Sequence, residues 1–290
     1  RAAIDTMTDR FASTVNILAI PGIRESFVTD HAIDRVKDFG QALYLMDMSQ
    51  YDADGTRLYD DSTGRPSVTK TISEFEGRTL DANSTAVYFP NVVIKDDNTG
   101  ANVEVPSSVA ALAALGFNDR VSFPWFAPAG FNRGSLDFVE NVGVRLTAGD
   151  RDALYDARIN PIATFPQQGF VIFGQKTLQM AKSALDRVNV RRMLLEVKRI
   201  VGQVANSYLF EQNTPALRAK FVSQVSPLLA VVQAQSGIEQ FKVVMDESNN
   251  TPEDIESNQL NGRIVIVPTR SIEFISIDFI VTNEGVSFTG

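Results

Sequence analysis

Residues 188–213, VNVRRMLLEVKRIVGQVANSYLFEQN, form the longest periodic segment of the chain, and the expected fold is organised around it. Its apolar residues recur every three or four positions, which is the period of an α-helix with one buried face. We therefore predict a long helix over 189–212, and at about 1.5 Å per residue it is roughly 35 Å long. A helix of that length can brace an entire domain. Its apolar stripe consists of Val190, Met193, Leu194, Val197, Val201, Val204 and Tyr208.

The opposite face of this predicted helix is basic, because it carries Arg191, Arg192, Lys198 and Arg199. Two interpretations remain open: a solvated face of a core helix, or a surface that contacts partner subunits. Glu196 lies within helical side-chain reach of both Arg192 and Arg199. The spacing leaves open whether Arg192 and Glu196 pair within the helix or across subunits.

The composition describes a folded globular protein. The chain has 290 residues, of which 44% are hydrophobic and 21% charged. That length is enough for two domains of ordinary size. No apolar run reaches the roughly 18 residues that span a bilayer, so we expect no membrane insertion. The sequence opens at Arg1 inside a polar, helix-like phrase, and we expect a C-terminal or protease-resistant fragment of a longer protein.

Several classes of chemistry are excluded by the residues that the sequence lacks. There are no cysteines, which excludes disulfides, zinc–thiolate sites and cysteine nucleophiles. The single histidine, His31, excludes multi-histidine metal sites. The net charge of −8 argues against a general affinity for nucleic acid.

The first half of the chain indicates an α/β unit followed by an irregular region. Strands are predicted at 15–22 and 42–48 around a helix at 27–39, and this strand–helix–strand order is typical of α/β folds. A polar, turn-rich surface loop follows at 49–66. Further predicted elements are helices at 67–80, 107–117 and 149–158, and strands at 85–94, 102–106 and 137–146.

The second half indicates helices packed on one face of a small sheet. After a strand at 169–174 and a helix at 176–187, the long helix leads to a helix at 215–236 and then to antiparallel strands that continue to the C-terminus. In the last strand, at 273–282, Ile275, Ile277 and Phe279 share one face and are expected to anchor it. We assign the α/β (α+β) class, with two domains, 1–162 and 163–290, each a small mixed sheet flanked by helices.

No stretch of the sequence nominates a catalytic, cofactor or metal site. GFVIFGQKT, residues 169–177, has glycines at nucleotide-loop spacing, but the residues between them predict a strand. The acidic turns at 52–55 and 96–100 lack the ligand spacing of a calcium loop. His31 fits an ordinary helix surface. We predict no enzyme and no cofactor, and a pocket that gathers titratable groups with shifted pKa values would instead favour an α/β nucleotide- or sugar-binding enzyme.

Phrases distributed along the chain resemble, in the same order, the tail sheath proteins of contractile-tailed bacteriophages. The departures are Phe173, where the family more often has tryptophan, and residues 1–85, which match only loosely. The resemblance is strongest from about 159 to 290. The phrases are VYFPNVVI (87–94), VPSSVAALAAL (105–115), APAGFNRGSL (127–136), INPIATFPQQGFVIFGQKTL (159–178), RVNVRRMLLEVKRIV (187–201), NNTPEDIESNQL (249–260) and FISIDFIVTNEGVSF (274–288).

This resemblance implies a structural, non-enzymatic virion protein. Sheath subunits of the family form hexameric rings that stack helically around a tail tube, and contraction drives the tube through the host envelope. The implied partners are other sheath subunits, joined through exchanged terminal strands, the tail tube protein and the baseplate. The implied location is the phage tail, with assembly in the host cytoplasm.

Two further expectations follow from the resemblance. No convincing exchange arm precedes residue 15, so we expect this chain to be largely monomeric alone. A bacteriocin or secretion-type contractile machine remains the alternative source of such a sheath. The residues expected to meet tube or sheath subunits are Arg191, Arg192, Lys198 and Arg199.

Overall fold

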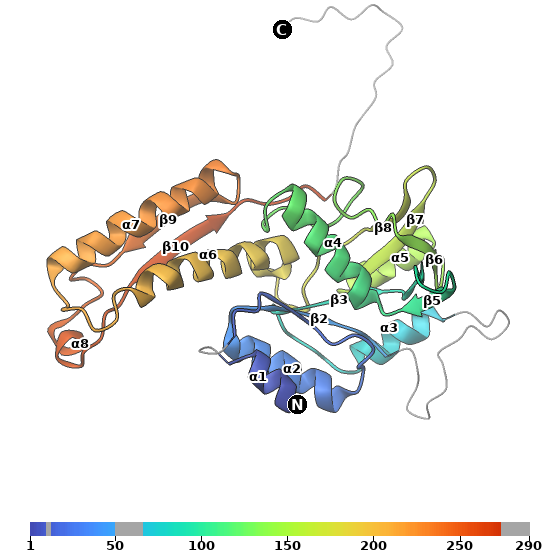
Figure 1. Cartoon of the computed structure of the whole chain (residues 1–290), viewed down its shortest axis with the longest axis horizontal. Helices are drawn as coiled ribbons and strands as arrows, with labels where there is room; N and C mark the ends of the chain where they lie inside the picture. The colour runs from blue at the N-terminus through green and yellow to red at the C-terminus, as the bar shows by residue number, and fades with distance from the viewer. Residues whose placement is uncertain (10–12, 50–65, 274–290) are drawn as a thin grey trace, which may run out of the picture.

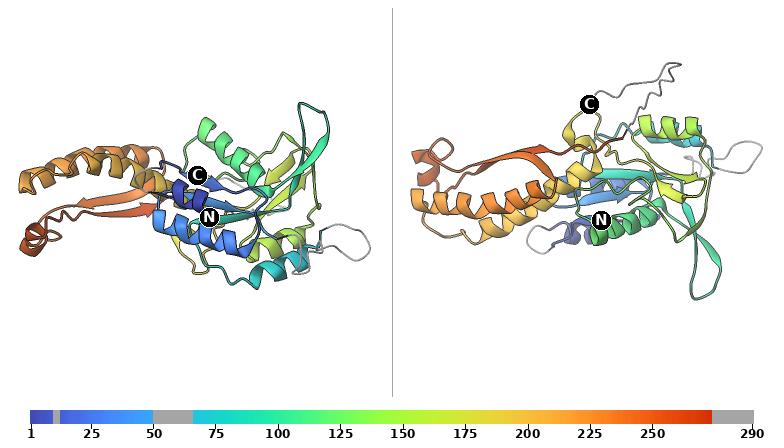
Figure 2. Two further views of the ribbon diagram at one scale, coloured as in Figure 1. Left: turned by 60° about the horizontal axis from the view of Figure 1, so that its bottom comes forward. Right: turned by 90° about the horizontal axis from the view of Figure 1, so that it is seen from above.

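The computed structural model describes residues 1–9, 13–49 and 66–273. These residues form an elongated molecule with a body and a projecting arm (Figures 1 and 2). The body (described residues up to 187) surrounds a five-stranded sheet. The arm (residues 188–268) consists of two long helices packed along a two-stranded sheet. The mixed α/β class predicted from the sequence is confirmed.

The body is built on a sheet with the strand order β1-β2-β3-β7-β8. The first four strands are parallel and β8 pairs antiparallel with β7. Helix α2 (Ser26–Phe39) connects β1 to β2, which confirms the strand–helix–strand unit. The strands are β1 (Ile17–Ala19), β2 (Leu43–Met46), β3 (Thr85–Phe89), β7 (Asn160–Phe165) and β8 (Gly169–Ile172).

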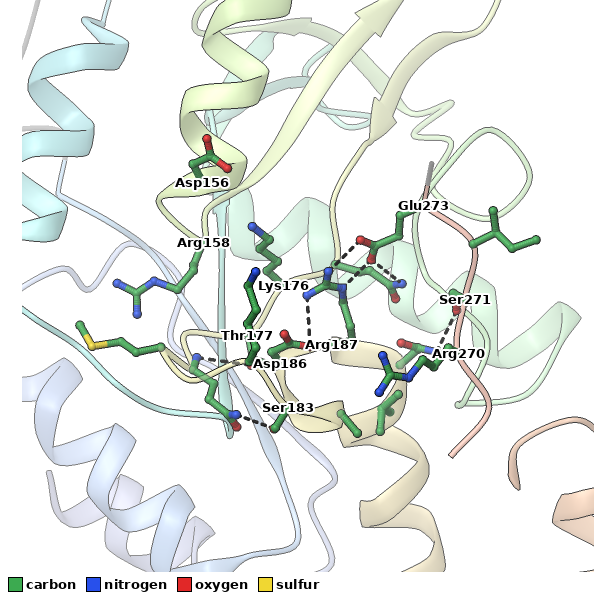
Figure 3. A pocket seen from close by; sticks show the side chains of 18 residues that line it. Asp156, Arg158, Lys176, Thr177, Ser183, Asp186, Arg187, Arg270, Ser271 and Glu273 are labelled. Carbon is green, nitrogen blue, oxygen red and sulfur yellow. Dashed lines mark hydrogen bonds and ion pairs between the residues drawn. The ribbon is translucent and has the colours of Figure 1, made fainter. Parts of the chain in front are cut away.

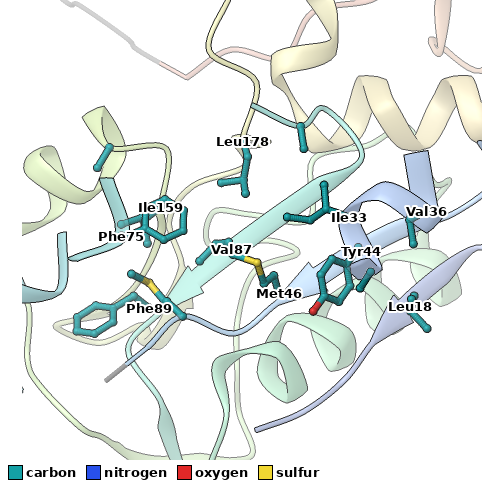
Figure 4. Packing of buried hydrophobic residues seen from close by; sticks show 14 of the residues in the cluster. Leu18, Ile33, Val36, Tyr44, Met46, Phe75, Val87, Phe89, Ile159 and Leu178 are labelled. Atoms are coloured by element: carbon teal, nitrogen blue, oxygen red, sulfur yellow. The ribbon is translucent and has the colours of Figure 1, made fainter. Parts of the chain in front are cut away.

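Both faces of this sheet are covered by helices, so its central strands are apolar throughout. One face packs against α2, α3 (Val68–Glu76) and α5 (Ala148–Asp156), with Tyr44, Val87 and Phe89 in the cluster (Figure 4). The other face packs against α4 (Ser107–Val121) and the start of α6. Sheets buried on both sides require near-continuous apolar strands, as the sequence of β2 and β3 shows.

A buried carboxylate joins two elements at the end of β2. Asp47 is 1% exposed and accepts hydrogen bonds from the backbone N–H of Gly22 at 2.9 Å and of Ser108 at 3.0 Å. The Ser108 hydroxyl also donates to it at 2.8 Å. Asp47 therefore caps the N-terminus of α4 and fixes the Pro-Gly turn after β1, where Gly22 has a positive φ of 82°.

The single histidine has a structural role. His31 Nε2 on α2 lies 2.9 Å from Asp5 Oδ1 on α1 (Ala2–Met7), and Arg35 Nε lies 3.0 Å from the same oxygen. These contacts tie the first helix to the second. They confirm the interpretation of His31 as a helix-surface residue.

The predicted strand at 85–94 is wrong, because the chain leaves the main sheet at Pro90. Proline has no N–H for the ladder, and the chain turns there. The following strand, β4, belongs to a separate antiparallel sheet of order β5-β4-β6. The predicted pairing of this region with 102–106 is confirmed for β4. The strands are β4 (Val92–Lys95), β5 (Asn102–Val105) and β6 (Val139–Val142).

The predicted helix at 176–187 is also wrong. Asn160 binds both backbone groups of Lys176: its Oδ1 accepts from the Lys176 N–H at 2.6 Å and its Nδ2 donates to the Lys176 carbonyl at 2.8 Å. These bonds hold the chain in an extended conformation and replace helical ones. Only a short 3₁₀ turn, η1 (Ala184–Asp186), forms before α6.

The predicted domain boundary after residue 162 falls inside β7, which spans 160–165. β7 and β8 complete the main sheet, so residues 163–172 belong to the body and not to a C-terminal domain. The prolines and glycine that suggested a linker instead form a tight turn between two paired strands. The predicted loop at 49–66 lies almost entirely outside the described residues.

The arm matches its prediction closely. α6 spans Val188–Asn206, shorter at its end than predicted, and α7 spans Pro215–Ala234 with Thr214 as its N-cap. β9 (Ile238–Val244) pairs antiparallel with β10 (Arg263–Pro268). Between them α8 (Pro252–Glu256) starts with a Thr251 capping box. The predicted strand at 273–282 lies, beyond its first residue, outside the described residues.

Candidate interaction surfaces on the arm and at its base

Two of the four basic residues predicted on the surface of α6 are buried. Arg191 is 6% exposed and Arg192 is 4% exposed. The start of α6 lies between body and arm, where Val188 and Leu195 pack into the body and Val190 and Met193 into the arm. This part of the helix has no solvated face, so the prediction of a basic contact surface at Arg191 and Arg192 is wrong. The period of the apolar residues predicted one buried face of α6. In the folded chain this part of α6 lies between body and arm, so its other face is buried as well.

The two buried arginines brace the helix instead. Arg192 Nη2 lies 2.5 Å from Asp119 Oδ2, and this ion pair links α6 to α4. Burial lowers the pKa of Arg191 from its ordinary value. The question that the sequence left open is thereby answered within one chain: Arg192 turns to Asp119, and Glu196 pairs with Arg199, whose Nε lies 2.9 Å from Glu196 Oε2.

Lys198 and Arg199 are exposed on the outer half of α6. They remain the part of the predicted basic surface that a partner can reach. Ile275, Ile277 and Phe279 lie outside the described residues, so their role as anchors of the last strand stays a prediction.

A network of polar side chains at the base of the arm holds the chain where it returns from β10 to the body (Figure 3). Arg187 donates to both carboxylate oxygens of Glu273, from Nε at 2.6 Å and from Nη2 at 2.9 Å. The Tyr155 hydroxyl on α5 also donates to Glu273. Gln175 Nε2 donates to Glu273 at 3.3 Å. The network joins residues separated by up to 118 positions, so no local pattern could have revealed it.

Burial and pairing in this network shift several pKa values. Burial alone would raise the pKa of Glu273, but the hydrogen bonds from Arg187 and Tyr155 outweigh it and hold the pKa below its ordinary value. Burial and then the hydrogen bond to Glu273 raise the pKa of Tyr155. Burial and the nearby Arg187 lower the pKa of Lys176.

In this network, which we call the clamp, side chains of opposite charge pair with one another. Lys176 Nζ lies 3.6 Å from the centre of the Tyr155 ring and donates to the Tyr155 carbonyl at 2.6 Å. The lysine of the nucleotide-loop-like phrase is therefore engaged, and the residues before it form strand β8, as predicted. Several groups with shifted pKa values do lie together here, but each of them is hydrogen-bonded or ion-paired to its neighbours.

Within the described part of the chain, no three histidine, cysteine, aspartate or glutamate residues are grouped so that they could hold a metal ion. No helix among the described residues has the length and apolar character needed to cross a bilayer. The base of the arm does contain a groove of about 1010 Å³, bordered by the clamp and by residues 179–190.

The arm coincides with a known domain. Residues 181–282 match the family described as phage tail sheath C-terminal domain. Curated relatives agree: the chain is 39% identical over 186 residues to the tail sheath protein of Vibrio phage KVP40 and 35% identical over 186 residues to that of Enterobacteria phage T4. Each match covers 64% of this chain but only 27% and 28% of those proteins, about a quarter of their length.

The sheath-like fold extends beyond the family domain. The chain resembles a chain of the anti-feeding prophage baseplate with a TM-score of 0.73 and 21% identity, over 92% of this chain and 68% of that one. It resembles a chain of the contracted PVC sheath complex, an extracellular contractile injection system, with a TM-score of 0.70 and 20% identity, over 92% and 70%. At such identities the likeness concerns the fold, and it covers body and arm together.

Proposed function

We propose that this chain forms part of the sheath subunit of a contractile phage tail, which polymerises around a tail tube and contracts to drive the tube through the host envelope. The observation that carries the proposal is the agreement of two findings. The arm matches the tail sheath C-terminal domain family, and body and arm together have the fold of chains in contractile assemblies. The role is mechanical, and the proposal involves no catalysis.

The proposed partners are other copies of the subunit and the baseplate, with the tail tube inside. The similar structures come from a baseplate and from a contracted sheath complex, which supports both kinds of contact. The two-stranded sheet of the arm supports them too. In the described residues, neither outer edge of the β9–β10 pair is hydrogen-bonded to a further strand. Open edges accept strands from neighbouring chains, which fits exchange of terminal strands that include Ile275, Ile277 and Phe279.

Within contractile machines, we favour a phage tail over an injection system. The curated relatives at 35–39% identity are phage tail sheath proteins, whereas the injection-system chains are similar at 20–21% identity. The proposed location is accordingly the virion tail, with assembly in the host cytoplasm.

The test is assembly of the purified chain on tail tubes, followed by electron microscopy. Alone, the 31.8 kDa chain should sediment mainly as a monomer. With tubes, it should form regularly spaced rings on the outside. Spontaneous rings or tubes of the chain alone would contradict the monomer proposal, and tubes that stay bare at saturating chain concentration would contradict the sheath proposal.

A matched pair of variants tests the basic surface of α6 in the same assay. Lys198→Glu with Arg199→Glu should reduce the number of rings, because both residues are exposed on the outer half of the helix. Lys220→Glu, an exposed lysine on α7, is the control and should assemble normally. Equal assembly of the two variants would remove Lys198 and Arg199 from the contact surface.

A further inference from the structure

We propose that the tip of the arm of one copy docks in the groove at the base of the arm of a second copy, with carboxylates of the tip on Lys182 and Arg270. The proposal rests on the proposed function for the identity of the partner, a neighbouring subunit. It adds the two surfaces that meet and the chemistry that holds them.

The groove is basic in a chain that is acidic overall. Five basic and three acidic residues line it, a net charge of +2, while the chain carries −8. Arg187 forms ion pairs with two of the acids, Glu273 and Asp186, so its own charge is engaged within the groove. Lys182 and Arg270 are exposed, and neither forms an ion pair with a carboxylate of a described residue. They are the positive charges that the groove offers to a partner.

The tip of the arm is the opposite in charge. We define it as residues 206–216 and 245–262, which lie at the end of the arm away from the body (Figures 1 and 2). Asn213 Nδ2 on the first segment donates to the Gln259 carbonyl on the second at 2.9 Å, so the two segments form one surface. The tip contains no lysine or arginine. Its carboxylates are Glu211, Asp246, Glu247, Glu253, Asp254 and Glu256.

Four of these six carboxylates are available to a partner, and the exposed Glu211 is one of them. Asp246 and Asp254 accept local hydrogen bonds in a turn and in the cap of α8. Glu247, Glu253 and Glu256 are exposed, and none has an ion-pair partner among the described residues. Like charges concentrated at one end of an elongated molecule, with the opposite charge at the base of the same arm, favour head-to-tail contact between copies.

Apolar surfaces lie beside the charges on both sides. At the tip, Leu209 is 65% exposed and Phe210 is fully exposed. Adjoining the basic groove is a hollow of about 280 Å³ whose lining includes Phe173 and Ile272, which are 43% and 81% exposed. Groove and hollow share Gln175, Ile272 and Glu273, so they form one continuous receptor. The hollow receives the apolar residues of the tip while the groove receives its carboxylates.

A contact of this kind joins two different surfaces of the same chain. Such heterologous contacts leave a free tip and a free groove at the ends of every oligomer, so they generate rings or helical filaments. This outcome fits a sheath lattice. It also commits the groove to a second copy of this chain as its occupant.

Disulfide trapping tests the contact directly, because the natural sequence has no cysteine. Single variants Ser257→Cys on the tip and Ala181→Cys at the groove, both exposed and uncharged neighbours of the proposed contact residues, are mixed at high concentration and oxidised. The expected product is a mixed dimer, and the double variant should give a ladder of dimers, trimers and larger species. Lys95→Cys, an exposed residue on β4, replaces Ala181→Cys in the control mixture and should give only background dimers.

The charge requirement is tested in the same trapping reaction. Raising the salt concentration to about 0.5 M should reduce the mixed dimer at least about threefold, because exposed charges are screened within a few ångströms. Glu247→Lys with Glu256→Lys on the tip should abolish trapping, and adding Arg270→Glu on the groove side should restore it at least in part. A mixed dimer no more abundant than the control, or one insensitive to salt and charge reversal, overturns the proposal.

Failure here is distinguishable from failure of the sheath proposal. Trapping uses the purified chain alone and reports only the tip–groove contact. If rings form on tail tubes but trapping fails, the subunits meet through other surfaces. If trapping succeeds but tubes stay bare, the contact is real and the sheath role is wrong.

Discussion

Removing the partner of a buried arginine should be the most damaging change at the junction of body and arm. Arg192 is 4% exposed and its pairing carboxylate, Asp119, is 32% exposed in its side chain. Asp119→Ala leaves the guanidinium buried with no carboxylate, whereas Arg192→Met removes the charge and keeps an apolar side chain of similar length. The structure therefore predicts that Asp119→Ala, on the more exposed residue, destabilises the protein more than Arg192→Met.

The magnitudes follow from burial. Removing one partner of a fully buried pair costs about 3–5 kcal/mol, and partial exposure of Asp119 reduces our value for Asp119→Ala to about 2–3 kcal/mol. Arg192→Met should cost about 1 kcal/mol or less, because an apolar replacement of a buried ion is often neutral. The double variant should resemble Arg192→Met, since its Asp119 partner no longer matters.

The assay is urea denaturation followed by two signals. Trp125 is the only tryptophan; it packs in the arm cluster and donates through Nε1 to the Gln235 carbonyl at 3.0 Å, so its fluorescence reports the arm. Circular dichroism reports the whole chain, and disagreement between the signals would reveal separate unfolding of body and arm. Glu196→Ala, which breaks an exposed pair on the same helix, is the control and should cost about 0.5 kcal/mol or less. If Asp119→Ala costs no more than Arg192→Met, the reasoning from buried charge is refuted.

Three further outcomes are expected. The carboxyl of Glu273 has a pKa in the folded state below its ordinary value of 4.5. Its pair with Arg187 therefore stabilises the protein fully above pH 4.5, and this stabilisation is lost as the pH falls through the folded-state pKa. The difference in urea midpoint between wild type and Glu273→Gln should accordingly shrink between about pH 6 and about pH 3. Gly174→Ala would place a Cβ 2.9 Å from a buried proline ring of β7 and should cost about 1–3 kcal/mol, whereas Gly149→Ala on α5, with nothing within 4 Å, should be neutral or stabilising in thermal melts. Asp47→Ala leaves the buried N–H of Ser108 and the part-buried N–H of Gly22 unpaired and should cost about 2–3 kcal/mol in urea denaturation, and a loss below about 1 kcal/mol would contradict its role as a cap.

The elements of the arm could be predicted because their signals are local. α6 and α7 have long apolar periods, Thr214 and Thr251 mark helix starts, and β10 alternates exposed and half-buried residues. The α/β unit around α2 was equally clear, because two apolar strands flank one amphipathic helix. In each case the pattern lies within about 20 residues, which is the range over which periodicity carries information.

Two of the errors in the predicted elements arise from contacts with other segments of the fold. Asn160 satisfies the backbone of Lys176 and so prevents a helix that its sequence permits. The segment that contains β7 and the turn after it has the composition of a linker, but β7 pairs with β3 and so lies in the main sheet. Neither partner is visible in the local pattern.

The spacing of apolar and basic residues was enough to predict one long amphipathic helix in the arm, with its arginines on one side. It was not enough to predict that Arg191 and Arg192 are buried while Lys198 and Arg199 are exposed, because this difference arises from α4 and the rest of the body packing against the first half of α6. The same holds for Glu273, whose partners come from α5 and from the segment before α6. The period of the apolar residues predicts which side of a helix faces the core. Burial of each side depends on the other segments that pack against it, and those contacts form only when the whole chain is folded.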